Sequence, residues 1–345
     1  MDGWRRFSCG ADDAGRRLDR LLRKLFPALP LSAIHRSIRR GSVRVNGEKA
    51  RPEQRVGEGD IIFAHPGLSI PERVIPESEA LKDIIEPRAL RIILETPDIL
   101  FVGKDAGILV HGGENSLEQH VRAYLASRIG DSLSFRPGPL HRLDRNTSGI
   151  IAFSKSLAGA RNYSRALHDG LLRKTYLAVL EGGIDMEQHW TDSIERDGKT
   201  CKSRTHREDV GGEDAGKLAS LRLEPLVSSS GLSLVAVRLE TGRTHQIRVQ
   251  ASSRGFPLYG DIKYGGTRAS RPYWLHAWKL SGPLDLIPLP NGLIVDPLPK
   301  YFSDFLFERF ALGEKEVYSL LDGMFAEEAK TNGRYRIHRE NSQNA

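Results

Sequence analysis

A proline-bearing stretch over residues 65–88 limits how this chain of 345 residues can fold. Charged residues fill the stretch, few side chains in it can build a core, and it holds four prolines, Pro66, Pro71, Pro76 and Pro87. This composition is typical of a semi-extended linker. The sequence therefore predicts a small domain over residues 16–64 and a larger one over residues 89–311, and the chain is long enough to bury a core in at least one of them.

Positive charge is concentrated in the smaller domain. Residues 16–55 hold twelve Lys and Arg against three acidic residues, a net charge of +9, whereas the whole chain carries +7 and the remainder therefore −2. Such a distribution is typical of a separate module for a polyanion, either a nucleic acid or a membrane surface. A membrane-binding helix is the weaker reading, because the apolar face of residues 18–25 is only two turns long.

The small domain is expected to combine two helices with short strands. Leucines at 18, 21, 22 and 25 have helical spacing, and Ser32 is expected to cap a second helix that ends at Gly41. Alternating valines at 43 and 45 and the dipeptide Asn46-Gly47 predict a hairpin, and residues 61–63 a last strand. Residues 1–15 are expected to form a flexible lead.

This pattern resembles the small RNA-binding domain named after ribosomal protein S-four. The residues that carry the resemblance are Ser32, the segment Ile38-Arg39-Arg40-Gly41, the segment Val45-Asn46-Gly47 and the turn Gly59-Asp60. RNA contacts are expected from the arginines of the two helices and their approach: Arg16, Arg17, Arg20, Arg36, Arg39 and Arg40. The alternative is a solvated basic helix pair without a ligand.

The larger domain is expected to be an α+β fold, a mostly antiparallel mixed sheet with scattered helices. The expected strands are residues 90–94, 99–102, 150–153, 174–181, 221–227, 232–240 and 273–280. Helices are expected after a capping box at Ser116 and Gln119, over residues 157–168, and shortly after Arg243. Residues 312–345 are expected to hold one amphipathic helix and a polar tail that begins near Lys330.

Several classes of protein are disfavoured by composition. The N-terminus is followed by no apolar run of signal-peptide type, and the longest apolar runs are four or five residues. Cys9 and Cys201 lie far apart without metal-ligand spacing, which indicates incidental thiols in a reducing compartment. The histidines 141, 245 and 276 also lack zinc-site spacing and are expected to be hydrogen-bonding scaffold. We therefore expect no metal, no membrane association and a cytoplasmic protein.

Three polar clusters stand out in the larger domain: residues 141–149, residues 173–176 and residues 241–248. The first reads His-Arg-Leu-Asp-Arg-Asn-Thr-Ser-Gly and matches all seven fixed positions of the central motif of the RluA-type pseudouridine synthases. The chain resembles this family over roughly residues 90–310. The resemblance implies isomerisation of uridine to pseudouridine in RNA, and an N-terminal module of this kind is typical of the branch that modifies large-subunit (23S) ribosomal RNA.

The chemistry of this isomerisation explains the residue types. The bond from the ribose to the ring nitrogen breaks, the uracil rotates, and a ring carbon rejoins the sugar, so no atoms are added and no cofactor is expected. One ionised carboxylate is required, as a nucleophile or as a base, and the sequence leaves both open. The resemblance implies that Asp144 is this carboxylate, that Arg243 keeps it charged and that Tyr176 stacks on the base.

Two further positions bear on the resemblance. A uracil in folded RNA must be extruded before it can react, and Arg142 matches the family position whose flat guanidinium fills the gap. The first family motif usually contains Lys-Pro-x-Gly, whereas this chain has Lys104, Asp105, Ala106 and Gly107. Aspartate at the proline position puts the rigidity of that turn in question, and leaves the catalytic set intact.

The leading hypothesis is a pseudouridine synthase that acts on large-subunit ribosomal RNA as a monomer. A transfer RNA substrate is the alternative within the same class. An RNA-binding ribosome assembly factor without turnover is the alternative from another class, and the presence of Asp144 argues against it.

Overall fold

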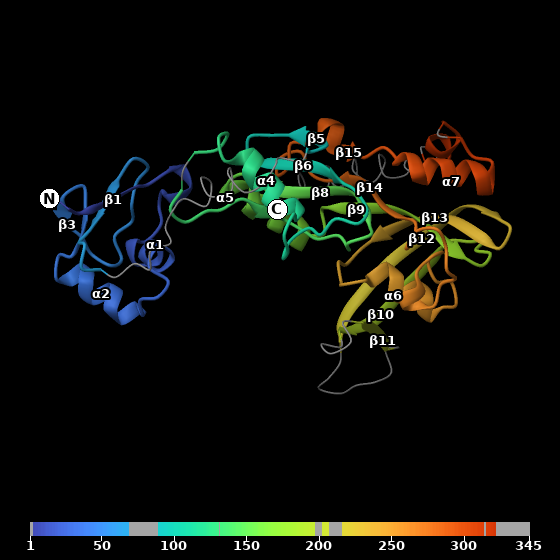
Figure 1. Cartoon of the computed structure of the whole chain (residues 1–345), viewed down its shortest axis with the longest axis horizontal. Coiled ribbons are helices and arrows are strands. Elements are labelled where there is room, and N and C mark those ends of the chain that lie inside the picture. The colour runs from blue at the N-terminus through green and yellow to red at the C-terminus, as the bar shows by residue number, and fades with distance from the viewer. Residues whose placement is uncertain are drawn as a thin grey trace, which may run out of the picture. The chain divides into compact units, whose positions relative to one another are not determined.

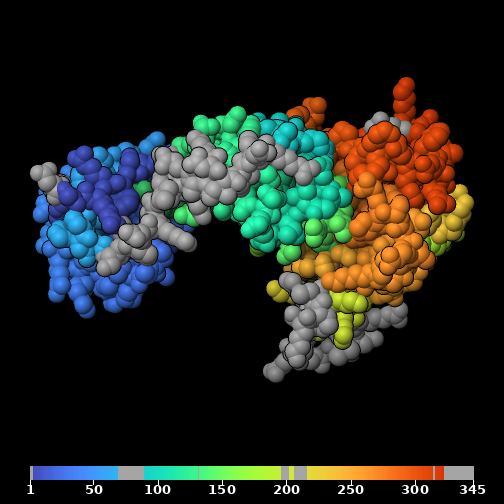
Figure 2. All heavy atoms as spheres, in the orientation of Figure 1, coloured from blue at the N-terminus to red at the C-terminus, as the bar shows by residue number. Residues whose placement is uncertain are grey.

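The computed structural model describes residues 3–68, 89–130, 132–196, 202–206, 216–313 and 315–321, which are the coloured atoms of Figure 2. Most of the expected linker and the whole expected polar tail lie outside these residues, so both remain predictions. The chain divides into two compact units. The first comprises residues 1–145, 150–172 and 282–294, and the second comprises residues 146–149, 173–281 and 295–345.

The N-terminal domain of the first unit has two helices and a four-stranded antiparallel sheet. Helix α1 spans Leu18–Leu25 and helix α2 spans Leu31–Arg39. The sheet has the order β1-β4-β2-β3, with β1 at Arg5–Ser8, β2 at Val43–Val45, β3 at Glu48–Lys49 and β4 at Ile61–Ala64. The predicted helices, hairpin and last strand are confirmed.

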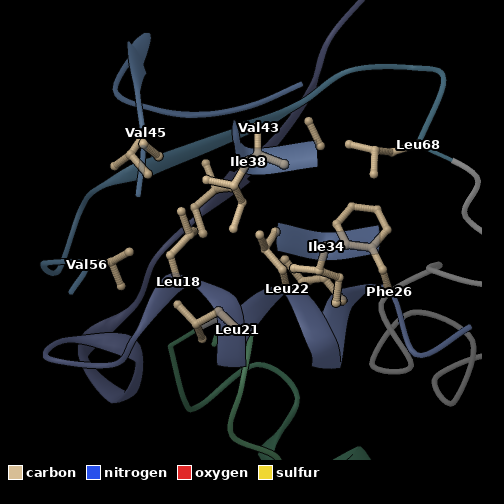
Figure 3. Close-up of a cluster of buried hydrophobic side chains, with 14 of the residues drawn as sticks. Leu18, Leu21, Leu22, Phe26, Ile34, Ile38, Val43, Val45, Val56 and Leu68 are labelled. Carbon is tan, nitrogen blue, oxygen red and sulfur yellow. The ribbon is translucent and has the colours of Figure 1, made fainter. Parts of the chain in front are cut away.

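The helices are held on the sheet by one apolar core (Figure 3). Leu18, Leu21 and Leu22 of α1 are fully buried, and so are Ile34 and Ile38 of α2. Their spacing places all of them on one face of each helix, which leaves the arginines between them on the other. Each such leucine or isoleucine contributes about 1.5–3 kcal/mol through the apolar area that it removes from water.

Two local predictions for this domain are wrong. Residues 5–8 form strand β1, which pairs with β4 from Arg5 opposite Ala64 to Ser8 opposite Ile61, because the edge of β4 offers unpaired backbone groups. Helix α2 starts one residue before Ser32, with Pro30 as its N-cap and no side-chain cap. Ser32 therefore lies inside the first turn.

The larger sheet confirms the expected mixed, mostly antiparallel fold (Figure 1). In the second unit its order is β11-β10-β12-β13-β9-β14, followed by the first residues of β8. These strands are β8 (Ser148–Ser154), β9 (Arg173–Glu181), β10 (Gln188–Arg196), β11 (Ser203–His206), β12 (Lys217–Ser229), β13 (Leu232–Leu239) and β14 (Leu275–Ser281). Strand β8 continues into the first unit, where the order is β8-β6-β5 with β6 at Ile99–Lys104 and β5 at Ile92–Glu95.

Helices flank these strands near the positions expected. They are α4 (Leu117–Leu125), α5 (Leu157–His168) and α6 (Gln246–Ser253). The expected capping box of α4 is not formed, because Ser116 makes no side-chain cap bond. Helix α7 (Lys300–Phe310) was not predicted; its Phe302, Phe305 and Leu306 pack on the face of the sheet that carries Leu177 and Val179.

The C-terminal helix is observed in part. Residues 315–321 are helical, and Val317 and Leu321 are buried in the same core as α7. The rest of the predicted helix, with Met324 and Phe325, lies outside the described residues. Among the helices that the structure describes, none is long and apolar enough to cross a membrane.

Candidate active site

The loop that carries Asp144 is anchored at its start by His141. The backbone N–H of Ala152 donates to Nε2 of this histidine at 3.1 Å, and the ring stacks on Tyr163 with centroids 5.9 Å apart and planes 5° apart. Because Nε2 accepts a hydrogen bond, the ring proton resides on Nδ1. The prediction that His141 is hydrogen-bonding scaffold is confirmed, and the start of the loop is fixed against strand β8, which the loop then enters.

Lys104 ties the first motif to the same loop. Its side chain is fully buried, and Nζ donates at 2.9 Å to the backbone carbonyls of Asp105, Ile108 and Arg145. Gly107 adds two bonds, since its N–H donates to the Arg145 carbonyl and its own carbonyl accepts from Arg145 Nε. Lys104 therefore stabilises the turn that lacks the usual proline. It also fixes the backbone of Arg145, the residue directly after Asp144.

Burial lowers the pKa of Lys104 to about 7, while the carboxylates of Asp144 and Asp105 act to raise it. The folded protein therefore releases this proton at a lower pH than the unfolded chain, whose lysines titrate near 10.5. Between these two values the folded state binds fewer protons, so stability rises with pH by up to about 1.4 kcal/mol per unit.

We expect Lys104→Met to lower the free energy of unfolding by about 2–4 kcal/mol at pH 7, because three buried carbonyls lose their donor. The stability difference between wild type and variant should widen from pH 7 toward pH 10. Urea titrations at several pH values measure it. A difference that narrows over this range would contradict the assigned direction of the pKa shift.

The end of the loop is packed against strand β14 in the second unit. A Cβ on Gly149 would lie 2.3 Å from the carbonyl oxygen of Ala277, and φ of this glycine is +116°, a region that L side chains avoid. Ser148 Oγ lies 2.9 Å from Nδ1 of His276 and 3.0 Å from the Tyr301 hydroxyl. His276 Nε2 lies 3.0 Å from the carbonyl of Asp296, to which it donates, so Nδ1 accepts from Ser148.

Tyr176 lies in the same lateral row of the sheet as Gly149, the last residue of this loop. Tyr176 pairs with Ala277 across the antiparallel β9–β14 ladder, and Ala277 pairs with Gly149 across the parallel β14–β8 ladder. Two of the three motifs thus lie in one lateral row of the sheet, on strands β9 and β8, with β14 between them. The Tyr176 side chain is buried, with 6% of its surface exposed.

Arg243 lies in the turn between β13 and α6. Gln246 Oε1 accepts from the Arg243 backbone N–H and from the Thr241 hydroxyl, both at 2.9 Å, and Gln246 Nε2 donates to the Ser220 carbonyl at 3.0 Å. The Arg243 side chain is exposed, and its Nε donates to the carbonyl of Leu218. His245 adopts a left-handed conformation as the N-cap of α6, and its Nδ1 lies 2.8 Å from the Tyr264 hydroxyl, which is a scaffold role as expected.

The remaining candidate residues differ in their exposure. Asp144 is half-buried and Arg142 is exposed, both in the first unit. Since Arg243 and Tyr176 belong to the second unit, the ion pair of Asp144 with Arg243 stays a prediction.

The arginines expected to bind RNA are mostly accessible. Exposed are Arg20 of α1, Arg36 and Arg39 of α2, and Arg40 directly after α2, whereas Arg16 and Arg17 are half-buried. Arg17 is held in a two-bond ion pair with Asp19, through Nε at 3.1 Å and a terminal nitrogen at 2.7 Å. Its charge is thereby partly satisfied within the protein, so the four exposed arginines are the stronger candidates.

Three positioning contacts were not anticipated from sequence: the carbonyls around Lys104, the partners of Ser148 and the bonds of Gln246. Each joins segments far apart in the chain, and only the run of polar residues in the motifs signals them. The structure contains no cluster of three or more His, Cys, Asp or Glu side chains suited to a metal within the residues that it describes.

Comparison with known proteins agrees with the site. The family described as RNA pseudouridylate synthase matches residues 98–253, and the S4 domain matches residues 16–62. The chain is 32% identical to the uncharacterized RNA pseudouridine synthase YlyB of Bacillus subtilis, over 72% of this chain and 79% of that protein. It is 33% identical to ribosomal large subunit pseudouridine synthase C of Rickettsia bellii, over 76% and 87%.

A solved structure supports the same assignment. The human RNA pseudouridylate synthase domain containing 1 superposes with a TM-score of 0.50 at 26% identity, covering 64% of this chain and 89% of that one. With the matched family, the relatives and the three motifs in hand, the chain belongs to the RNA pseudouridine synthases, the isomerases that convert uridine to pseudouridine in RNA, and carries an S4 domain at its N-terminus.

Proposed function

We propose that this enzyme isomerises specific uridines in large-subunit (23S) ribosomal RNA, acting as a monomer in the cytoplasm. The observation that carries the proposal is the likeness to proteins named ribosomal large subunit pseudouridine synthase C, which extends over 87% of one of them. The S4 domain, in which the predicted RNA-binding residues Arg20, Arg36, Arg39 and Arg40 are exposed, supports a large structured RNA as the substrate.

The proposed reaction proceeds in four steps. Arg142 occupies the gap left when the target uridine leaves its stack. Asp144, kept ionised by Arg243, attacks the nucleotide or removes a proton from the sugar while the bond from C1′ to N1 breaks. The detached uracil rotates while stacked on Tyr176, and C5 then bonds to C1′ as the Asp144 carboxylate leaves the nucleotide or returns the sugar proton. C5 releases its proton, and N1, which holds the electron pair of the broken bond, gains one. All groups required are side chains of this chain and the RNA itself.

Release of tritium from C5-labelled uridine tests the substrate. We expect turnover with fragments of large-subunit ribosomal RNA and at least about tenfold lower kcat/KM with transfer RNA, a difference of about 1.4 kcal/mol in transition-state binding. Mapping of pseudouridines in a deletion strain identifies the site in the cell. If the missing pseudouridines lie in transfer RNA alone, the substrate proposal is wrong and the enzyme class stands.

A role in ribosome assembly without turnover is tested separately. An Asp144→Ala strain that grows and assembles ribosomes normally, beside a deletion strain that does not, would show a binding function beyond catalysis.

A further inference from the structure

Lys174 is a lysine without a partner in an apolar part of the sheet. It lies at the second position of β9 and is half-buried. Within the part of the chain that the structure describes, its amine has no hydrogen bond and no ion pair. Burial lowers its pKa to about 8, with no neighbouring charge to oppose the effect.

The surroundings of Lys174 are defined by strand register. Leu239 of β13 and Leu280 of β14 lie directly opposite Lys174 on its two neighbouring strands. Residues opposite one another in a sheet point to the same face, so two leucines flank the lysine stem. Partial loss of hydration disfavours the charged form of an amine in such a place, as its lowered pKa indicates.

Lys174 shares its face with Tyr176. Alternation along β9 puts these two residues on one face, about 7 Å apart between Cα atoms. The opposite face, with Leu177 and Val179, is covered by the core that includes α7. Opposite Tyr176 lie Val237 and Ala277, so the residues that face Lys174 and Tyr176 on the two neighbouring strands are apolar.

This arrangement suits the charge that develops in the reaction. When the C1′–N1 bond breaks with its electron pair on N1, the negative charge of the uracil spreads to O2 and O4. Attack of a carboxylate on the ring would likewise move charge to a carbonyl oxygen. A cation held in an apolar site stabilises such charge strongly, because no water must reorganise during the reaction.

We propose that Lys174 is a catalytic residue that donates a hydrogen bond from its ammonium group to a carbonyl oxygen of the uracil stacked on Tyr176. The bond is weak in the ground state and strengthens as negative charge collects on the detached ring. It is lost when C5 bonds to C1′ and the ring returns to neutrality. The inference rests on the proposed function, in which Tyr176 stacks on the uracil. It concerns recognition of the uracil base and not of the RNA sequence around the target uridine.

The test is Lys174→Met, which keeps the stem and removes the amine. We expect kcat to fall about 10²-fold, the usual effect of removing one donor to a developing oxyanion, with KM changed less than about threefold. The rate constant in single-turnover assays should fall by the same factor as kcat. The midpoint of thermal unfolding should be equal or higher, because a partly desolvated amine without a partner in the described structure has been removed. A lysine that only supports the fold would instead lose stability on substitution.

Controls separate this proposal from the proposed function. Lys300→Met removes an exposed lysine that pairs with Asp304 on α7, and should leave kcat unchanged within about twofold. Lys174→Arg keeps a charged donor and should recover at least about a tenth of the wild-type kcat. If wild type is active and Lys174→Met retains kcat within about twofold, the inference is overturned, whereas inactivity of wild type on ribosomal RNA would contradict the proposed substrate instead.

Discussion

Replacing Asp144 with Asn is expected to lower pseudouridine formation by at least about 10³-fold, since the substitution removes the ionised carboxylate that acts on the nucleotide. Asparagine has the same shape and cannot serve as a base or a nucleophile at neutral pH. RNA affinity should stay within about threefold of wild type, because the change affects the reaction and leaves the S4 domain intact. Tritium release measures the rate, and filter binding of labelled RNA measures the affinity.

A matched control uses a carboxylate outside the motifs. Asp169 follows α5, is exposed and lies 3.1 Å from the neighbouring ring of His168. Asp169→Asn alters charge by the same amount and should leave the rate unchanged. Equal tritium release by Asp144→Asn and wild type would remove Asp144 from the mechanism, and would leave the family membership of the chain untouched.

Neutralising Arg20, Arg36, Arg39 and Arg40, four of the exposed arginines of the S4 domain, is expected to weaken RNA binding by about 10²-fold or more at low salt, because each releases counterions from a phosphate. The variant carries Gln at positions 20, 36, 39 and 40. The slope of log affinity against log salt should decrease by about 3, close to 0.7 for each lost phosphate contact. Binding isotherms at four or five salt concentrations measure both quantities.

The control for this prediction carries the same loss of charge elsewhere. Arg165, Lys300, Arg309 and Lys315 are exposed on other helices of the chain. Their replacement by Gln should change affinity and salt slope far less than the S4 variant does. If both variants weaken binding equally, net charge rather than the S4 surface governs affinity, and the alternative of a solvated helix pair is correct.

Local elements of the fold were largely readable from the sequence. Helix α1 follows the leucine spacing from Leu18 to Leu25, and α5 spans the predicted residues 157–168, with the Ser156 hydroxyl accepting from the Gly159 N–H at its start. These features depend on residues within one or two turns of each other. Strand β1 and helix α7 were missed, because each exists only through pairing or packing with distant segments.

In the candidate site, too, the residues in local motifs were predicted from the sequence, whereas contacts between distant segments were not. The sequence alone identified the family through nine consecutive residues, and it named Asp144, Tyr176 and Arg243 by their positions in three motifs. It carried no sign that Lys104 would be buried under three carbonyls or that Lys174 would stand unpartnered beside Tyr176.

Chemical identity along the chain determined the family, the reaction and the charge of the RNA-binding module, because motif residues and helix periodicity are local properties. The tertiary structure alone decided which polar groups are satisfied and which are not. Satisfaction depends on the strands and carbonyls that surround a side chain, and those come from segments tens of residues away. The apolar surroundings of the half-buried Lys174 accordingly come from Leu239 of β13 and Leu280 of β14, which lie far from it along the chain.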